Sequence, residues 1–327
     1  MKQKIKIEKN LLIRKTFPFV VFFYISRFLL FLSRNHWFLL WLSIELTTLA
    51  FIPIINNKSK RFVETIVIYF LIQAISSAFL IFGFLQNQIL LLENQIFNIC
   101  LIALIVKLSI APFHSWFPPI LTKIDKTSII LIFTFQKLQP FLFLFLNNPL
   151  RKVLFLFIIL TCLTGSISNM IQNNIKLILS YSRISHGGWL LIALWINKRI
   201  WTLYLLVYFI TIFLICKIFI SNLTQIFSKT TVKFSWRILL ISLAGIPPLI
   251  GFYPKIIVLE EILSITFFLI LFILLITATV DFFIYTRTFY ISFFNMSPSI
   301  IWINSTIKPP STLIFLILRR FSLFILL

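Results

Sequence analysis

Residues 101–120 read "LIALIVKLSIAPFHSWFPPI", and this stretch decides what kind of fold the chain adopts. Six apolar residues lead up to Lys107, and Pro112 follows five positions later. Neither a soluble core nor a lipid-facing helix readily accommodates such a lysine, because burying an unpaired charge is costly. The stretch therefore indicates a membrane-crossing segment that combines a buried charge with a break in the helix.

The composition of the whole chain supports a membrane protein. Of 327 residues, 60% are hydrophobic and 12% are charged, and the mean hydropathy is +1.04. Soluble domains contain about half apolar and about a quarter charged residues. Apolar windows of about 20 residues, the length of a spanning helix, follow one another along the chain. Because these runs are continuous rather than alternating, they predict an all-α, polytopic transmembrane helix bundle and not a β-barrel.

The pattern of charge and cysteine excludes several other classes. The net charge of +22 is spread over short loops and a basic N-terminal tail, residues 1–10. No compact basic module is present, so we expect no nucleic-acid partner. Cys100, Cys162 and Cys216 are isolated from one another, and no nucleotide-binding motif occurs. We therefore expect no metal and no redox or nucleotide cofactor on this chain.

The apolar runs predict about eleven spans in a single integral membrane domain, residues 1–327. These lie near 11–33, 37–55, 63–85, 96–117, 127–147, 153–171, 177–196, 200–220, 238–259, 262–285 and 311–327. With this count, most loop lysines and arginines lie on the side that carries the N terminus. The positive-inside rule then predicts an N terminus on the cytoplasmic or matrix side.

Few ionisable residues remain inside these spans once the loops are set aside. They are Arg27, Glu45, Lys107, Lys137, Arg183, Lys217 and Lys255. A charge at mid-helix costs about 2.5–3.5 kcal/mol on insertion scales, and such residues commonly mark ion pathways. Lys217 and Arg27 lie near span ends, where snorkelling to the interface explains them better than function.

Three of the lysines have a proline close by in the sequence. Lys107 is followed by Pro112, Lys137 by Pro140, and Lys255 is preceded by Pro247, Pro248 and Pro254. Proline frees the carbonyl four residues earlier, which at Pro112 is the carbonyl of Leu108. A free carbonyl, water and an amine that can be neutralised would form a proton relay. The alternative is that the prolines only kink helices and the lysines only pair structurally.

Glu45 and three further residues complete the candidate site. Glu45 is the acid well inside the first half of the chain, so it predicts an ion pair with a lysine, either structural or switching. His114 and His186 are possible relays, or hydrogen-bonding residues between helices. Lys176 is a third relay candidate.

The two proline-containing segments suggest an internal repeat. "VKLSIAPFHSWFPP" and "LAGIPPLIGFYPK" lie five expected spans apart and so run in opposite directions. Inverted repeats with discontinuous helices are the common plan of secondary transporters. We therefore expect two broken helices, with a first repeat over 11–147, a second over 153–285, and a C-terminal helix over 311–327.

Several motifs together resemble a known family. "NHWFLLWLSIELTTLAFIPII", "KLSIAPFHSWFP", "TFQKLQP", "LILSYSRISHGGW" and "AGIPPLIGFYPKIIVLEE" occur in order between about 35 and 290. They resemble the antiporter-like subunit 2 family of mitochondrial NADH:ubiquinone oxidoreductase, respiratory complex I. The resemblance is to the animal form, which has eleven helices and a matrix N terminus.

The resemblance implies a role for each motif residue. Glu45 and Lys107 match the family's glutamate–lysine pair, while Lys137 matches its central lysine and Lys255 the lysine of the second broken helix. It further implies a hetero-oligomer with other membrane-arm subunits, contact with membrane lipids, and a place in the mitochondrial inner membrane. Ser109 stands where the family usually has glycine, and Arg183 where it usually has serine.

We expect the chain to contribute to proton translocation through this Glu/Lys axis, while electron transfer takes place on other subunits. Two alternatives remain open at the sequence level. One is a cation/proton antiporter subunit of the same fold. The other is a structural membrane scaffold whose lysines only form ion pairs.

Overall fold

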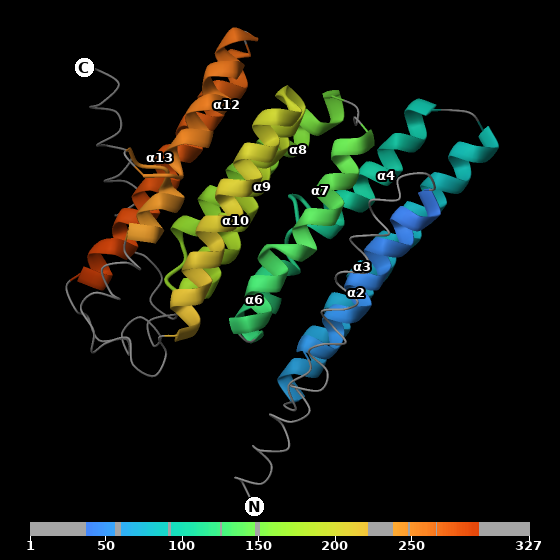
Figure 1. The fold of residues 1–327 in the computed structure, drawn as a ribbon, viewed down its shortest axis with the longest axis horizontal. Coiled ribbons are helices and arrows are strands. Elements are labelled where there is room, and N and C mark those ends of the chain that lie inside the picture. The colour runs from blue at the N-terminus through green and yellow to red at the C-terminus, as the bar shows by residue number, and fades with distance from the viewer. Residues whose placement is uncertain are drawn as a thin grey trace, which may run out of the picture.

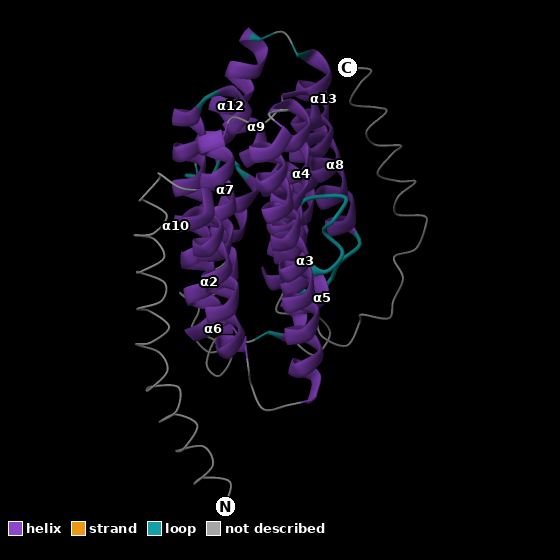
Figure 2. Ribbon diagram, turned by 90° about the vertical axis from the view of Figure 1, so that its right-hand side faces the viewer, coloured by secondary structure: helices purple, strands orange, loops and turns teal. Residues whose placement is uncertain are grey.

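The computed structural model describes residues 37–55, 60–90, 93–124, 126–147, 151–221, 238–247, 249–265 and 267–293. Within these ranges the secondary structure is helical, without a β-strand, as Figure 2 shows. The all-α prediction is therefore confirmed. The expected spans 11–33 and 311–327, and the basic tail, lie outside the described residues.

The helices follow the expected spans closely. They are α2 (Trp37–Ile55), α3 (Lys60–Leu90), α4 (Glu93–Leu108), α5 (Phe117–Lys123), α6 (Lys126–Phe133), α7 (Phe135–Asn147), α8 (Arg151–Met170), α9 (Ile175–Ile196), α10 (Lys198–Ser221), α12 (Phe252–Ser264) and α13 (Phe268–Phe293). Residues 238–244 are helical as well. Three ends were predicted too early: α3 continues to Leu90 instead of 85, α12 to Ser264 instead of 259, and α13 to Phe293 instead of 285. In α12 the charged pair Glu260–Glu261 lies within the helix rather than at its end.

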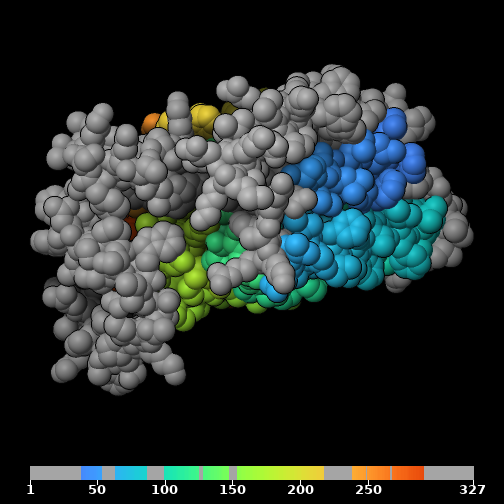
Figure 3. Space-filling view, turned by 90° about the horizontal axis from the view of Figure 1, so that it is seen from below, coloured from blue at the N-terminus to red at the C-terminus, as the bar shows by residue number. Residues whose placement is uncertain are grey.

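The described helices form an elongated bundle in chain order. Figure 1 shows α2, α3 and α4 at one end and α12 and α13 at the other. From below, α2–α4 form one end of the described surface, and the segments coloured green lie beside them (Figure 3). Within the described ranges, five stretches are long and apolar enough to cross a membrane: Val63–Gln86, Ser128–Leu146, Val153–Met170, Lys198–Cys216 and Phe268–Tyr290. Shorter apolar stretches occur at 38–53 and 99–108.

Helix α9 lies in the centre and contacts α8, α10, α5 and α12. It is buried almost all round from Ile178 to Ala193, as expected for a helix enclosed by others. Glycines allow the closest approach: a Cβ at Gly188 would lie 2.4 Å from Cys162 Sγ, and one at Gly165 would lie 2.6 Å from Ser185 N. Small residues commonly permit such close packing between membrane helices.

Both expected helix breaks are present, and both begin at a residue with left-handed backbone. Helix α4 ends at Leu108, and Ser109 follows with φ of 56°. The amides of Ser109 and Ile110 bond to the carbonyls of Val106 and Ile105, each at 3.1 Å, which is the Schellman pattern of helix termination. The second break begins at Gly245, whose φ is 79°. Its amide donates to the Ser242 carbonyl at 3.2 Å.

Candidate functional site: buried lysines at two broken helices

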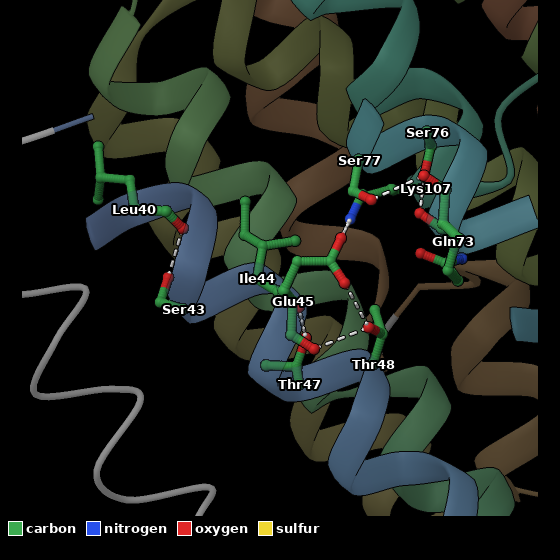
Figure 4. Close-up of polar contacts among 11 residues, drawn as sticks. Leu40, Ser43, Ile44, Glu45, Thr47, Thr48, Gln73, Ser76, Ser77 and Lys107 are labelled. Atoms are coloured by element: carbon green, nitrogen blue, oxygen red, sulfur yellow. Dashed lines mark hydrogen bonds and ion pairs between the residues drawn. The ribbon is translucent and has the colours of Figure 1, made fainter. Parts of the chain in front are cut away.

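Glu45 on α2 and Lys107 on α4 form an ion pair at the first break. Lys107 Nζ lies 3.6 Å from Glu45 Oε1, and their side chains are 1% and 20% exposed. Figure 4 shows the lysine pointing from α4 toward the carboxylate, with Gln73, Ser76 and Ser77 close by. The hydroxyl of Thr48 donates to Glu45 Oε2 at 3.2 Å. The structure thus brings together the acid and the first lysine that the sequence predicts.

Lys137 on α7 is buried among aromatic side chains and one carbonyl. Its exposed fraction is 1%, and Nζ donates to the carbonyl of Arg183 at 3.3 Å. The amine lies 4.6 Å from the centre of the Tyr208 ring and 5.6 Å from that of Phe141. Ring faces stabilise an ammonium, so this lysine has partners without having a carboxylate in contact.

Lys255 on α12 contacts the end of the helix that the second break interrupts. Its Nζ donates to the carbonyl of Ala244 at 2.9 Å and lies 5.4 Å from the centre of the Trp189 ring. The last carbonyls of a helix lack intrahelical partners and attract cations. Gly245 makes the contact possible, because a Cβ there would lie 2.9 Å from Lys255 Cδ. The break therefore supplies both the carbonyl that accepts the hydrogen bond and the space for the lysine side chain.

His186 on α9 lies in the region between the second and third lysines. Its Nδ1 is 2.9 Å from the hydroxyl of Tyr204, and the ring also lies within hydrogen-bonding reach of the backbone of Leu243. It interacts electrostatically with both Lys137 and Lys255. A cavity of about 10 Å³ opens beside it, and its lining includes Tyr208, Thr211 and Ser242. The cavity is just large enough to admit one water molecule, and its lining is mainly apolar with a few hydroxyl groups.

The other relay candidates occupy more peripheral places. His114 lies in the first break, partly buried, and its Nδ1 has no hydrogen-bond partner. Lys176 lies at the start of α9 and donates to the carbonyls of Thr122 and Ile124, at 3.0 and 2.8 Å. It thus binds the C-terminal end of α5, away from the three buried lysines.

The structure corrects one detail of the expected relay. The carbonyl of Leu108 was predicted to be free to hold water, but the hydroxyl of Ser109 donates to it. The left-handed backbone of Ser109 brings its side chain back to the helix end. Pro112 and Pro247 lie within the two breaks, as expected, whereas Pro248 lies outside the described residues. Pro140 lies within α7.

Two buried charges went unassigned in the sequence reasoning. Asp281, in the middle of α13, is 1% exposed. It lies inside the expected span 262–285 but was left out of the ionisable residues considered there. Arg183 was noted without a role. It is 3% exposed, and its guanidinium carbon lies 4.1 Å from the centre of the Phe117 ring. A lone charge in an apolar run was the signal for both.

In the part of the chain that the structure describes, no group of three or more His, Cys, Asp or Glu side chains could hold a metal ion. Cys100, Cys162 and Cys216 are buried free thiols. The site is therefore built from amines, carboxylates, hydroxyls and imidazoles that can hold or pass protons.

Two broken helices in an apolar bundle, each ending beside a buried lysine, define an antiporter-like membrane protein. Consistent with this class, residues 34–280 match the family model described as "NADH:quinone oxidoreductase/Mrp antiporter, TM". NADH-ubiquinone oxidoreductase chain 2 from Xenopus laevis is 34% identical over 94% of this chain and 96% of its own. The same protein from Symphalangus syndactylus is 34% identical over 82% of each chain. The chain therefore belongs to the NADH-ubiquinone oxidoreductase chain 2 family.

Solved structures share the fold at lower identity. A chain of respiratory complex I from Thermus thermophilus superposes with a TM-score of 0.72 at 22% identity, covering 82% of this chain and 68% of that chain. A chain of the Mrp complex from a Dietzia species gives a TM-score of 0.67 at 14% identity, over 78% of this chain and 56% of that chain. These likenesses confirm the antiporter-like fold.

Proposed function

We propose that this chain carries protons within the membrane arm of NADH-ubiquinone oxidoreductase, along the buried axis Glu45–Lys107–Lys137–Lys255. Family membership makes the chain a multi-pass membrane subunit of this proton-translocating enzyme, in the mitochondrial inner membrane and in a complex with other membrane-arm subunits. The proposal adds the residues, a matrix-side N terminus, and the assignment of electron transfer to cofactors on other chains.

The observation that carries the proposal is the buried pair of Glu45 and Lys107 beside the first helix break. A buried ion pair is a poor source of stability, because desolvation offsets much of the attraction. The pair is better explained by a change of charge during turnover. When Lys107 releases its proton, the Glu45 carboxylate loses its counter-charge and favours protonation of a nearby site.

The other two lysines suit proton transfer for a related reason. Lys137 and Lys255 each donate to a single backbone carbonyl, and a neutral amine retains hydrogens that can make the same bond. Loss of the charge therefore leaves the hydrogen-bonding arrangement intact. His186, its partner Tyr204 and the hydroxyls that line the small cavity provide groups through which a proton could pass from one lysine toward the other.

Replacing Lys107 with Met tests the proposal, because Met removes the amine while retaining an unbranched side chain. We expect the complex to assemble, to oxidise NADH slowly, and to pump about 10²-fold or more slowly, as for loss of one positioned proton carrier. The measurement is the rate of proton uptake per assembled complex, in proteoliposomes that contain the purified complex and are supplied with NADH.

Lys123→Met is the matched control. Lys123 forms the other ion pair of the described region, with Glu64 at 3.2 Å, but both side chains are exposed. Exposed pairs contribute little, so this variant should pump normally. Normal pumping by Lys107→Met would show that the lysines are structural. Pumping that required Na⁺ or K⁺ in exchange would instead support the cation/proton antiporter.

A further inference from the structure

We infer that Asp281 on α13 is the counter-charge of Lys255, and so a second acid–lysine unit placed at the second helix break. This inference rests on the proposed function for its role in pumping. Asp281 then acts as a positioning residue: its negative charge favours the ammonium form of Lys255, and it does not itself carry the proton.

Because Asp281 is buried in an apolar stretch, packing alone does not explain why a carboxylate is found there. The residue is 1% exposed within the apolar stretch 268–290, and its Oδ1 has no hydrogen-bond partner. A carboxylate at such a place is costly unless a cation or several donors compensate it. The Ser185 hydroxyl lies within hydrogen-bonding reach of the Asp281 carboxylate. It has a single hydrogen, however, and also donates to the Ser182 carbonyl at 3.0 Å.

Lys255 is the cation that interacts electrostatically with Asp281. Helix α12, which carries the lysine, packs against both α13 and α9. No direct ion pair joins the two side chains in the described structure, but charges in a low-dielectric interior interact over longer separations than in water. Cys162, Tyr204 and Tyr285 are the other titratable groups near the carboxylate.

Among the residues that the structure describes, Asp281 is the one carboxylate that interacts electrostatically with Lys255. Its Nζ is bound to the Ala244 carbonyl and faces the Trp189 ring, and both of these interactions are weaker than a full negative charge. The arrangement matches the first break, where Lys107 faces Glu45. Each broken helix then has one lysine and one acid from a neighbouring helix, whereas Lys137 interacts electrostatically with a second cation, Arg183.

The decisive variants are Asp281→Asn, which keeps the shape, and Asp281→Glu, which keeps the charge. In purified, assembled complex we expect Asp281→Asn to lower the rate of proton pumping per complex about tenfold, equivalent to about 1.4 kcal/mol. Asp281→Glu should recover most of the loss. Glu260→Gln, at an exposed acid on α12, is the control and should pump normally. Normal pumping by Asp281→Asn would overturn the inference.

A double variant keeps the test decisive if Asp281→Asn fails to assemble. An unpaired buried charge destabilises more than the loss of both partners, so adding Lys255→Met should restore assembly. If the double variant assembles no better than Asp281→Asn alone, Asp281 serves packing and the inference is wrong. Because assembly is measured without pumping, this result stands even if Lys107→Met shows the proposed proton axis to be wrong.

Discussion

Two adjacent glycines on α9 provide a sharp test of how closely the bundle is packed. A Cβ added at Gly188 would lie 2.4 Å from Cys162 Sγ and 2.7 Å from Thr161 Oγ1, both on α8. A Cβ added at Gly187 would meet Lys137 Nζ at 3.9 Å and Ile110 Cγ1 at 4.0 Å, which are ordinary contacts. We therefore expect Gly188→Ala to destabilise the chain and Gly187→Ala to be tolerated.

The magnitude follows from comparing the two changes. Both gain about the same helix propensity, up to about 1 kcal/mol for Gly to Ala. The difference between them is therefore the overpacking cost at Gly188, about 1–3 kcal/mol. Cys162 is fully buried, and its backbone N would lie 3.2 Å from the new methyl group. The contact can thus be relieved only by moving α8 and α9 apart.

The assay is the midpoint temperature at which the purified complex loses this subunit, measured for each variant by native electrophoresis after heating. Combining Gly188→Ala with Cys162→Ala should recover part of the loss, because the Sγ contact is removed and the Thr161 contact remains. Equal midpoints for Gly187→Ala and Gly188→Ala would refute the packing argument.

Three further predictions concern charge and topology. Glu45→Gln should assemble but slow coupled turnover, since the counter-charge of the first lysine is lost; pumping at the normal rate would leave Glu45 a structural role at most. Cysteines introduced at Ser59 and Asn197 should react with impermeant thiol reagents from opposite sides of the membrane, and labelling from the same side would contradict the eleven-span topology. Arg183→Lys should lower thermal stability by about 1 kcal/mol, because lysine keeps the charge but loses the planar contact with Phe117; an unchanged midpoint would show that this contact adds nothing.

The sequence predicted the principal lysines well because the background is so apolar. In a chain with 12% charged residues, a lysine within a 20-residue apolar run is conspicuous, and its burial follows from the length of the run. The acid partner of Lys107 could be predicted for the same reason. Contacts with Arg183 O, Ala244 O and the aromatic rings depend on which helix faces rotate toward one another, and no local pattern specifies that.

Asp281 shows a limit of a different kind. It lies inside the expected span 262–285 and could have been selected, as Glu45 was, from its position in an apolar run, but it was left out of the ionisable residues considered. The end of α12 was predicted at 259, before the acids Glu260 and Glu261. In the structure Glu260 is exposed on the side of a helix that continues to Ser264.

The helix breaks show that left-handed residues, as well as prolines, end the interrupted helices. Ser109 and Gly245 occupy the same position after their helices, with φ of 56° and 79°. A residue with a Cβ pays about 1–2 kcal/mol in this conformation, and glycine does not. Ser109 offsets part of that cost through its hydrogen bond to the Leu108 carbonyl. Ser109→Gly should therefore leave stability almost unchanged.

Gly245→Ala should behave differently, because alanine has the strain without a compensating hydroxyl. Its Cβ would also lie 2.9 Å from Lys255 Cδ, so the lysine must shift and its bond to the Ala244 carbonyl weakens. We expect a lower thermal midpoint together with slower pumping in Gly245→Ala, and neither effect in Ser109→Gly. If Gly245→Ala loses stability but pumps at the normal rate per assembled complex, the position of Lys255 at the helix end does not matter for proton transfer.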